Sequence, residues 1–260
     1  MIYFDRLDSR YVLKCTLHSD EALHVGTGVS GTNTDAPVIT MNGKPFLPGS
    51  SLRGVLRATA ERLLDTLWRD QQCLSFAKPI PNCDSGVDKP EVLEQKIKDN
   101  KATFCDMCQF FGSTNLAARF KVGDATQTAA RQPIRRDGVG IDRDTETARD
   151  QIKYDFEVLE PGVDFSFTMQ IENATLSDKA ILYLLLCELK NGIDVGGKRA
   201  RGLGRVRLSD VSVEYFDQAG DSGHKLRDYL LSGNLAPKPA GQFDAELKQA
   251  FAQYRRAKEQ

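Results

Sequence analysis

The sequence lacks long hydrophobic runs and has no marked excess of either charge. Its longest apolar run, at residues 180–187, is far shorter than the roughly 20 residues that span a bilayer, so we expect no membrane segment. The first residues lack the basic flank and apolar core of a secretion signal, which favours a cytoplasmic protein. The formal net charge is only −1. This excludes a globally basic binder, so any affinity for a polyanion must come from local patches.

Histidine is also scarce. The chain has three histidines, His18, His24 and His224, and none has an evident catalytic partner close in sequence. An enzyme that works through a general acid–base pair is therefore disfavoured. His24 could act as a base because imidazole titrates near neutrality. A histidine packed at the end of a strand is the more ordinary explanation.

What the sequence does contain is a set of four segments with glycine, serine or arginine where a phosphate backbone would need them, at residues 47–57, 131–136, 137–149 and 194–207. The most informative is the glycine-rich loop at residues 196–207, which has four glycines, five cations and no carboxylate. Such a loop can bring its amides close to phosphates while arginines clamp them. The ordinary alternative is a solvated basic turn before a strand. The candidate RNA-binding residues here are Gly196, Gly197, Lys198, Arg199, Arg201 and Arg205.

The segment at residues 47–57 predicts the start of a helix. Apolar residues recur at helical spacing over residues 52–67, and Ser50 or Ser51 can cap that helix. A helix N-terminus offers unpaired N–H groups and a partial positive charge, so phosphate is a natural ligand there. Arg53 and Arg57 are four residues apart and share a face, which is more than capping requires. We therefore expect these four side chains to contact RNA.

Four of the six cysteines are spaced for a metal site. The pattern Cys73-x9-Cys83-x21-Cys105-x2-Cys108 supplies the four ligands of a tetrahedral structural zinc ion. A redox Cys-x2-Cys is the alternative, but the residues around Cys105 give no sign of the helix start that lowers a thiol pKa. Zinc would fold a polar insertion that has too little apolar surface to fold alone. Cys15 and Cys187 lie in apolar runs and are expected to be small buried hydrophobes.

The order of predicted elements favours an α+β fold. Alternating and helical patterns predict, in order, a strand (11–17), a helix (52–67), an insertion (71–101) with a helix near 92–98, a short strand (119–122), an exposed charged hairpin (131–151), a second hairpin (154–158 with 165–171), a helix (176–190) opened by Ser177 and Asp178, a strand (206–215) and a peripheral helix (243–258). This is the order of a ferredoxin-like sandwich, an antiparallel sheet with two helices on one face.

Six motifs in this order, at residues 23–26, 34–39, 47–54, 111–113, 138–148 and 196–204, extend the argument beyond fold class. The series resembles the RAMP superfamily, specifically the repeated backbone subunit of type III CRISPR interference complexes, over about residues 11–215. The cysteine-bearing insertion departs from the simplest members and resembles zinc-carrying insertions of type III-D and III-E relatives. The implied organisation is a modified RRM-like core (1–70 and 109–216) with a thumb hairpin (131–151), a zinc-binding insertion (71–108) and a peripheral C-terminal segment (217–260).

The resemblance implies that the protein binds guide RNA (crRNA) and target RNA and assembles with other RAMP subunits or further copies of itself. The thumb hairpin would push between nucleotides of the guide–target duplex. Ile141 would be the apolar wedge, with phosphate contacts from Arg131, Arg135, Arg136 and Arg143. A charged loop without fixed structure is the alternative for this segment.

The resemblance also assigns cleavage of the paired target RNA to Asp35. The 2′-hydroxyl would attack in line, and Mg²⁺ or another divalent cation at the carboxylate would shield the phosphate charge. Without the resemblance, an aspartate in a Gly/Thr/Asn-rich loop is a turn residue. Two further alternatives are a structural guide-binding subunit without cleavage activity and a standalone nuclease that processes precursor guide RNA.

Overall fold

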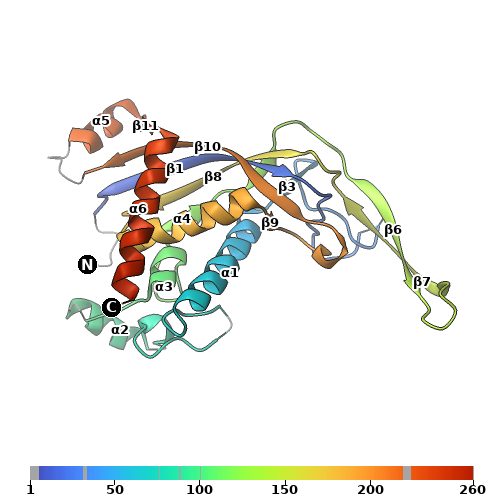
Figure 1. The fold of residues 1–260 in the computed structure, drawn as a ribbon, viewed down its shortest axis with the longest axis horizontal. Coiled ribbons are helices and arrows are strands. Elements are labelled where there is room, and N and C mark those ends of the chain that lie inside the picture. Colours follow the sequence, from blue (N-terminus) through green and yellow to red (C-terminus); the bar gives the residue numbers. More distant parts are fainter. Residues whose placement is uncertain are drawn as a thin grey trace.

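The computed structural model describes residues 6–31, 34–75, 77–87, 89–99, 101–218 and 224–259 (Figure 1), and of residues 148–152 and 224 it describes the backbone only. Its centre is a nine-stranded sheet in the order β11-β10-β1-β8-β5-β3-β2, with β4 also paired to β8 and β9 to β10. These strand pairs are antiparallel. The strands are β1 (Ser9–Ser19), β2 (Thr40–Met41), β3 (Lys44–Leu47), β4 (Phe120–Val122), β5 (Ala125–Gln127), β8 (Asp164–Glu172), β9 (Ile193–Asp194), β10 (Arg205–Asp217) and β11 (Ala236–Lys238).

Two helices complete the predicted ferredoxin-like core. The helices of the described chain are α1 (Gly49–Leu67), α2 (Pro90–Lys98), α3 (Asp106–Phe111), α4 (Leu176–Asn191), α5 (His224–Ser232) and α6 (Ala240–Lys258), with short 3₁₀ turns η1 (Asp84–Gly86) and η2 (Arg199–Arg201). Helix α1 follows β1, and α4 connects β8 to β10. Both lie on the same face of the sheet (Figure 1). The predicted α+β class with an antiparallel sheet is confirmed. No described helix combines the length and the apolarity that a membrane span needs.

The core forms where strand and helix periodicities meet. Strand β1 alternates strictly, so Leu13 and Leu17 face the helices and are completely buried. Helix α1 contributes Leu52, Leu56 and Leu64 to the same core; they lie along one face of the helix, and each is at most 2% exposed. Cys15, on the buried face of β1, packs as the sequence predicts, whereas Cys187 on α4 is only half-buried.

Helix α1 begins at Gly49, before either predicted serine cap. The N-cap residue is Pro48, and its side chain makes no capping hydrogen bond. The prediction that Ser50 or Ser51 caps the helix is therefore wrong. Gly49 instead donates its backbone N–H to Asp124 Oδ1 at 2.7 Å, so the cap comes from the turn between β4 and β5. A Cβ at Gly49 would lie 2.6 Å from the Val122 carbonyl oxygen, which explains why only glycine fits here. At α4, Thr175 caps the helix and Asp178 completes a capping box, so Ser177 is not the cap.

The second predicted hairpin has the right strands but the wrong partners. Strand β7 (Ala148–Val158) pairs with β6 (Ile134–Ile141), and β8 pairs with β1. Between β7 and β8, Gly162 donates its N–H to the Ser19 carbonyl at 2.8 Å, so the turn docks on β1 and redirects the chain. Alternation identifies a strand but not its neighbour, because every strand with one buried face shows it.

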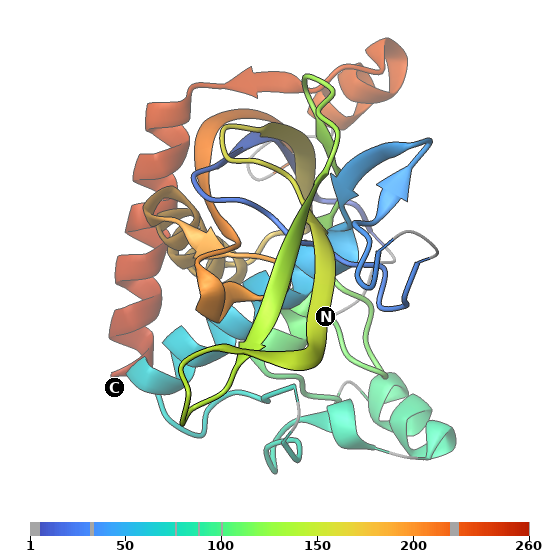
Figure 2. The same ribbon diagram turned by 90° about the vertical axis from the view of Figure 1, so that its right-hand side faces the viewer.

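Strands β6 and β7 form the exposed hairpin that the charged sequence predicts. They make a separate two-stranded sheet that extends away from the body in Figure 1 and crosses in front of it in Figure 2. Ile141, at the far end of β6, is 67% exposed. A single exposed apolar side chain is common on protein surfaces, so this exposure does not by itself indicate a function.

The cysteine-bearing residues and the last helix both pack on the same end of the core. The cysteines share a small buried cluster with Ala102 and Phe104. Helix α6 packs across α4 (Figure 1). The sequence predicts a peripheral helix, but α6 buries Phe243, Leu247 and Tyr254 in the main core. This helix is thus part of the hydrophobic layer.

Candidate nucleic-acid interface and metal centre

The glycines of the glycine-rich loop are explained by packing. Gly196 and Gly204 both have positive φ, and a Cβ at either would lie within 2.5 Å of a backbone oxygen, that of His24 or of Val195. Gly197 donates its N–H to the His24 carbonyl at 2.8 Å. These glycines therefore fix the loop against the segment around His24. The glycine content is structural, and the case for an anion ligand depends on the cations.

Two cations of the loop lie on aromatic rings of β7. Lys198 Nζ lies 4.5 Å from the centroid of the Phe156 ring, and the Arg201 guanidinium lies 5.6 Å from that of Tyr154. Arg201 also donates to the Tyr154 hydroxyl. The Tyr154 ring lies over Gly138 of β6, where a Cβ would be 2.3 Å from ring carbon Cζ. These contacts join the glycine-rich loop to the base of the hairpin.

Asp35 is exposed and is held at the same hairpin base. Asp35 donates its N–H to Asp155 Oδ1 at 2.7 Å, and the Asp155 N–H donates to Asp35 Oδ2 at 3.0 Å. The next residue, Ala36, forms a parallel bridge with Phe156. Asp155 also pairs with Arg135. The Thr34 hydroxyl, the Asp35 N–H and the Arg135 charge lower the pKa of Asp155 below its ordinary value.

His24 is a packing residue in this region. It is 6% exposed, and its Nδ1 lies 2.7 Å from the Glu157 carbonyl oxygen. Its ring packs edge-on against Phe156 at 5.8 Å. The ordinary explanation of a packed histidine therefore accounts for every contact that this residue makes in the described structure.

Arg53 and Arg57 converge on one cavity beside the turn after α3. Arg53 donates to the Phe111 carbonyl, and Arg57 donates to the Gly112 carbonyl at 3.2 Å. Arg57 also pairs with Glu61 at 2.8 Å. Both arginines line a cavity of about 540 Å³. Burial and the neighbouring Arg57 charge lower the pKa of Arg53, which shows that a positive charge at this position has little compensation.

A second cavity, of about 650 Å³, connects α1 to the glycine-rich loop. Arg62, Arg199 and Arg205 line it, together with Gly54. A third cavity along α1 shares Arg57 with the first and Gly54 and Arg62 with the second. The cavities therefore adjoin along one side of α1. We call this surface the cationic groove after Arg53, Arg57, Arg62, Arg199 and Arg205; the carboxylates of Glu61, Asp65, Glu188 and Asp194 line the same cavities.

The hairpin candidates are only partly joined to this surface. Arg131, Arg136 and Arg143 are exposed, whereas Arg135 is engaged by Asp155 and Asp137. Ile141 ends β6 and Arg143 lies in the turn that follows it, so both belong to the end of the hairpin that extends away from the body (Figure 1). The structure joins the glycine-rich loop both to the hairpin base and to the groove, joins Asp35 to the hairpin base, and leaves the hairpin tip apart.

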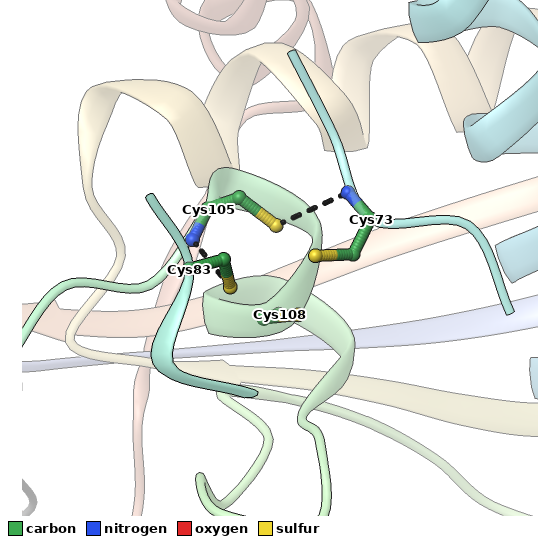
Figure 3. A group of neighbouring side chains, drawn as sticks. All are labelled: Cys73, Cys83, Cys105 and Cys108. Carbon is green, nitrogen blue, oxygen red and sulfur yellow. Dashed lines mark hydrogen bonds between the residues drawn. The ribbon is translucent and has the colours of Figure 1, made fainter. Parts of the chain in front are cut away.

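The four spaced cysteines form a compact cluster, drawn in Figure 3. The Sγ atoms of Cys73, Cys83, Cys105 and Cys108 all lie within 4.8 Å of one another. Ligands at about 2.3 Å around tetrahedral zinc would be about 3.8 Å apart, so a small contraction would close the site. Backbone N–H groups already point at the sulfurs: that of Cys73 donates to Cys105 Sγ at 3.5 Å and that of Cys105 to Cys83 Sγ at 3.4 Å.

The chemistry of the cluster also fits a cation. Hydrogen bonds from the Cys105 and Cys108 thiols lower the pKa of Cys83, but four thiolates this close cannot all ionise without a positive charge between them. The cluster could bind a metal such as zinc. Cys105 is the N-cap residue of α3, so the expectation that no helix starts here is wrong. The observation that disfavours a redox Cys-x2-Cys pair is instead that four sulfurs, and not two, lie together.

Sequence reasoning missed several residues at these sites, namely Arg62, Tyr154, Asp155 and Phe156. The two aromatic residues appeared as ordinary alternating strand positions, and their role shows only when the partner strand is known. Gly138 opposite Tyr154 was the available signal, because a glycine within a strand often marks a close approach.

Comparison with known proteins agrees with the resemblance in the motifs. No curated protein matches the chain. The family model described as the RAMP superfamily matches residues 14–207, a span that contains the groove, the glycine-rich loop, Asp35 and all four clustered cysteines. Because the match covers well over half of the sequence and the fold has the expected antiparallel α+β core, this chain belongs to the RAMP superfamily.

Proposed function

We propose that this protein is a guide-RNA-binding backbone subunit of a type III CRISPR effector complex and that it cleaves the paired target RNA with Asp35. Membership of the RAMP superfamily supports a CRISPR-associated RNA-binding protein. The observation that carries the proposal further is that α1 and the glycine-rich loop line adjoining cavities, while Lys198 and Arg201 of that loop contact the hairpin base. The cysteine-bearing insertion supports a relation to type III-D or III-E.

The cationic groove is suited to a single RNA strand. On the first turns of α1 the exposed positions are Ser50, Ser51, Gly54 and Ala58, small residues that let a sugar–phosphate chain approach the helix closely. Arg53 and Arg199, at the two ends of the groove, would contact different phosphates of the same strand. Ser50 and Ser51 are free to donate to phosphate oxygens because neither is needed as a cap.

Asp35 would perform its role at the base of the hairpin. Its carboxylate is exposed and has no ion-pair partner in the part of the chain that the structure describes, so the residue fits a divalent cation. Such a cation supplies charge neutralisation at the scissile phosphate. The Asp155 N–H holds the Asp35 carboxylate in one orientation. The hairpin, with Ile141 as its wedge, would hold the target strand unstacked beside it.

The cysteine cluster would bind a structural zinc ion. Its four sulfurs, their burial and the N–H groups directed at them support this. Zinc would supply the fold of residues 71–108 and would take no part in cleavage.

Substitution of Asp35 separates cleavage from scaffolding. The Asp35→Asn variant should assemble with guide RNA and the other subunits normally and should lose cleavage of target RNA at the positions that this subunit serves. Asp210→Asn, which changes an exposed aspartate on β10, is the matched control and should cleave normally. Normal cleavage by the assembled Asp35→Asn complex would establish the alternative, a structural guide-binding subunit without nuclease activity.

A further inference from the structure

The cavity that holds Arg53 and Arg57 has the cysteine insertion as one wall. Its lining includes Cys73, Ser85 and Cys108 together with the two arginines. Two of the candidate metal ligands therefore border the space in which α1 would hold a phosphate. With about 540 Å³, the cavity falls in the range of pockets that hold small ligands, so it can accommodate a phosphate with part of its nucleotide.

A short series of contacts connects the metal ligand Cys73 to Arg57. Ser75 lies two residues beyond Cys73, and its hydroxyl donates to Glu61 Oε1 at 2.7 Å. The same oxygen accepts from Arg57 Nε at 2.8 Å. Glu61 is 8% exposed, so its carboxylate has little freedom to find other partners. The position of the chain at Cys73 therefore determines how Glu61 holds Arg57.

The charges at this cavity are incomplete without an anion. Glu61 is the one carboxylate that pairs with either arginine among the described residues, and it pairs with Arg57. Arg53 is half-buried and donates to the Phe111 carbonyl. Burial and Arg57 disfavour the Arg53 charge. A phosphate between the two guanidinium groups would relieve both effects.

The wall has few buried apolar contacts, and what holds it besides them is polar: Asp84 pairs with Lys96 and accepts from the Thr103 N–H, and Asn115 donates to the Asp84 and Val87 carbonyls. Its buried cluster consists of Cys73, Cys83, Ala102, Phe104 and Cys108, so most of the buried side chains are thiols. Apolar burial on this scale cannot order a polar segment of this length. A metal ion at the sulfurs would supply the missing stability.

We propose that metal binding at the four cysteines and RNA binding at the Arg53–Arg57 cavity are coupled, so that each strengthens the other. The metal fixes the wall and, through Ser75 and Glu61, the orientation of Arg57. The bound phosphate in turn stabilises the wall that holds Cys73 and Cys108. This inference rests on the proposed function, because it takes single-stranded RNA as the ligand. It adds that the insertion regulates the affinity of the guide site.

The first test measures both sides of the coupling on the full chain. Fluorescence anisotropy with a labelled single-stranded RNA should show about tenfold weaker binding after zinc is removed by a chelator, with circular dichroism confirming that the core stays folded. By reciprocity, saturating RNA should tighten zinc binding by the same factor, measured by equilibrium competition with the chelator. Equal RNA affinity with and without zinc would overturn the coupling and leave the proposed function intact. Zinc-loaded protein that binds no RNA would overturn the proposed function itself.

Substitutions then locate the coupling without disturbing the thiols. Ser75→Ala should keep zinc affinity unchanged and weaken RNA binding about three- to tenfold in the zinc-loaded protein. Ser209→Ala, on β10 and remote from the cavity, is its control and should change neither. Arg53→Gln should reduce the effect of zinc on RNA binding, whereas Arg201→Gln should weaken binding by the same factor in both metal states. An equal zinc effect in Arg53→Gln and Arg201→Gln would show that the coupling does not pass through this cavity.

Discussion

The ion pairs of the cationic groove predict which arginines make the affinity for RNA depend on salt concentration. Arg199 and Arg205 line the same cavity, but among the residues that the structure describes only Arg205 of the two forms an ion pair, with its Nη1 3.5 Å from Asp194 Oδ1. A phosphate that contacts Arg199 displaces mobile counterions. A phosphate that contacts Arg205 must compete with Asp194, which has already neutralised part of the charge. The two arginines should therefore differ in salt dependence even though they are neighbours.

The magnitude follows from counterion release. Each phosphate neutralised on single-stranded RNA contributes about 0.7 to the slope of log affinity against log salt concentration. Arg199→Gln should therefore lower the slope by about 0.7, so that between 50 and 200 mM salt the variant loses about 2.6-fold less affinity than the wild type. Arg205→Gln should lower the slope by less than half of that amount.

The assay is a titration of fluorescent single-stranded RNA by anisotropy at four or more salt concentrations. Both variants should keep the thermal unfolding midpoint of the wild type, because both side chains lie at the surface of the cavity. An unchanged slope for Arg199→Gln would refute the assignment of this arginine to a phosphate. An equal or larger change for Arg205→Gln would refute the argument from the ion pair.

Two further predictions concern stability. Asp178 is completely buried and accepts a hydrogen bond from Arg119 at 2.9 Å, so Asp178→Ala leaves a buried guanidinium unpaired and removes a capping box. Urea unfolding should show that the free energy of unfolding falls by about 4 kcal/mol. A fall below about 1 kcal/mol would contradict the role of this buried pair. Burial alone would raise the pKa of Glu246, but hydrogen bonds from Lys179 and Lys238 hold that pKa below its ordinary value. The stability from this pair is present at neutral pH and disappears as the pH falls through the lowered folded-state pKa. Glu246→Gln should therefore unfold with a weaker pH dependence in the acid range, and an unchanged acid transition would contradict the assignment.

The sequence predicted those elements whose signal is local. The buried stripes of β1 and α1 follow from alternation and from i, i+4 spacing, and neither depends on a distant partner. The cap of α1 could not be predicted because it is Asp124, some 75 residues away. The strand that contains Tyr154 was recognised, but its partner was not, since pairing is set by contacts that the sequence pattern does not encode.

In the candidate site, too, some residues could be identified from the sequence and others only from the fold. Spacing alone identified the four cysteines, because metal ligands have a chemical type and a number that a sequence can display. The sequence predicted that the glycines at 196 and 204 let a phosphate approach closely, whereas the structure shows a different reason for glycine there, their packing against His24 and Val195. Asp155 and Arg62 carried no local signal of function. They became candidates only when the fold placed them beside Asp35 and α1.

The reciprocal hydrogen bonds between Asp35 and Asp155 connect the long hairpin to the Asp35 loop. Asp155 lies seven residues beyond Ala148, the cross-strand neighbour of Ile141, so the tip is roughly 24 Å of strand away from the Asp35 loop. The hydrogen bonds hold the Asp35 loop to the base of the hairpin. A nucleotide wedged at the hairpin tip would tilt the hairpin, and this tilt would also displace the Asp35 carboxylate. Under the proposed function, separation of the target strand by the hairpin and alignment of the Asp35 carboxylate would be one motion.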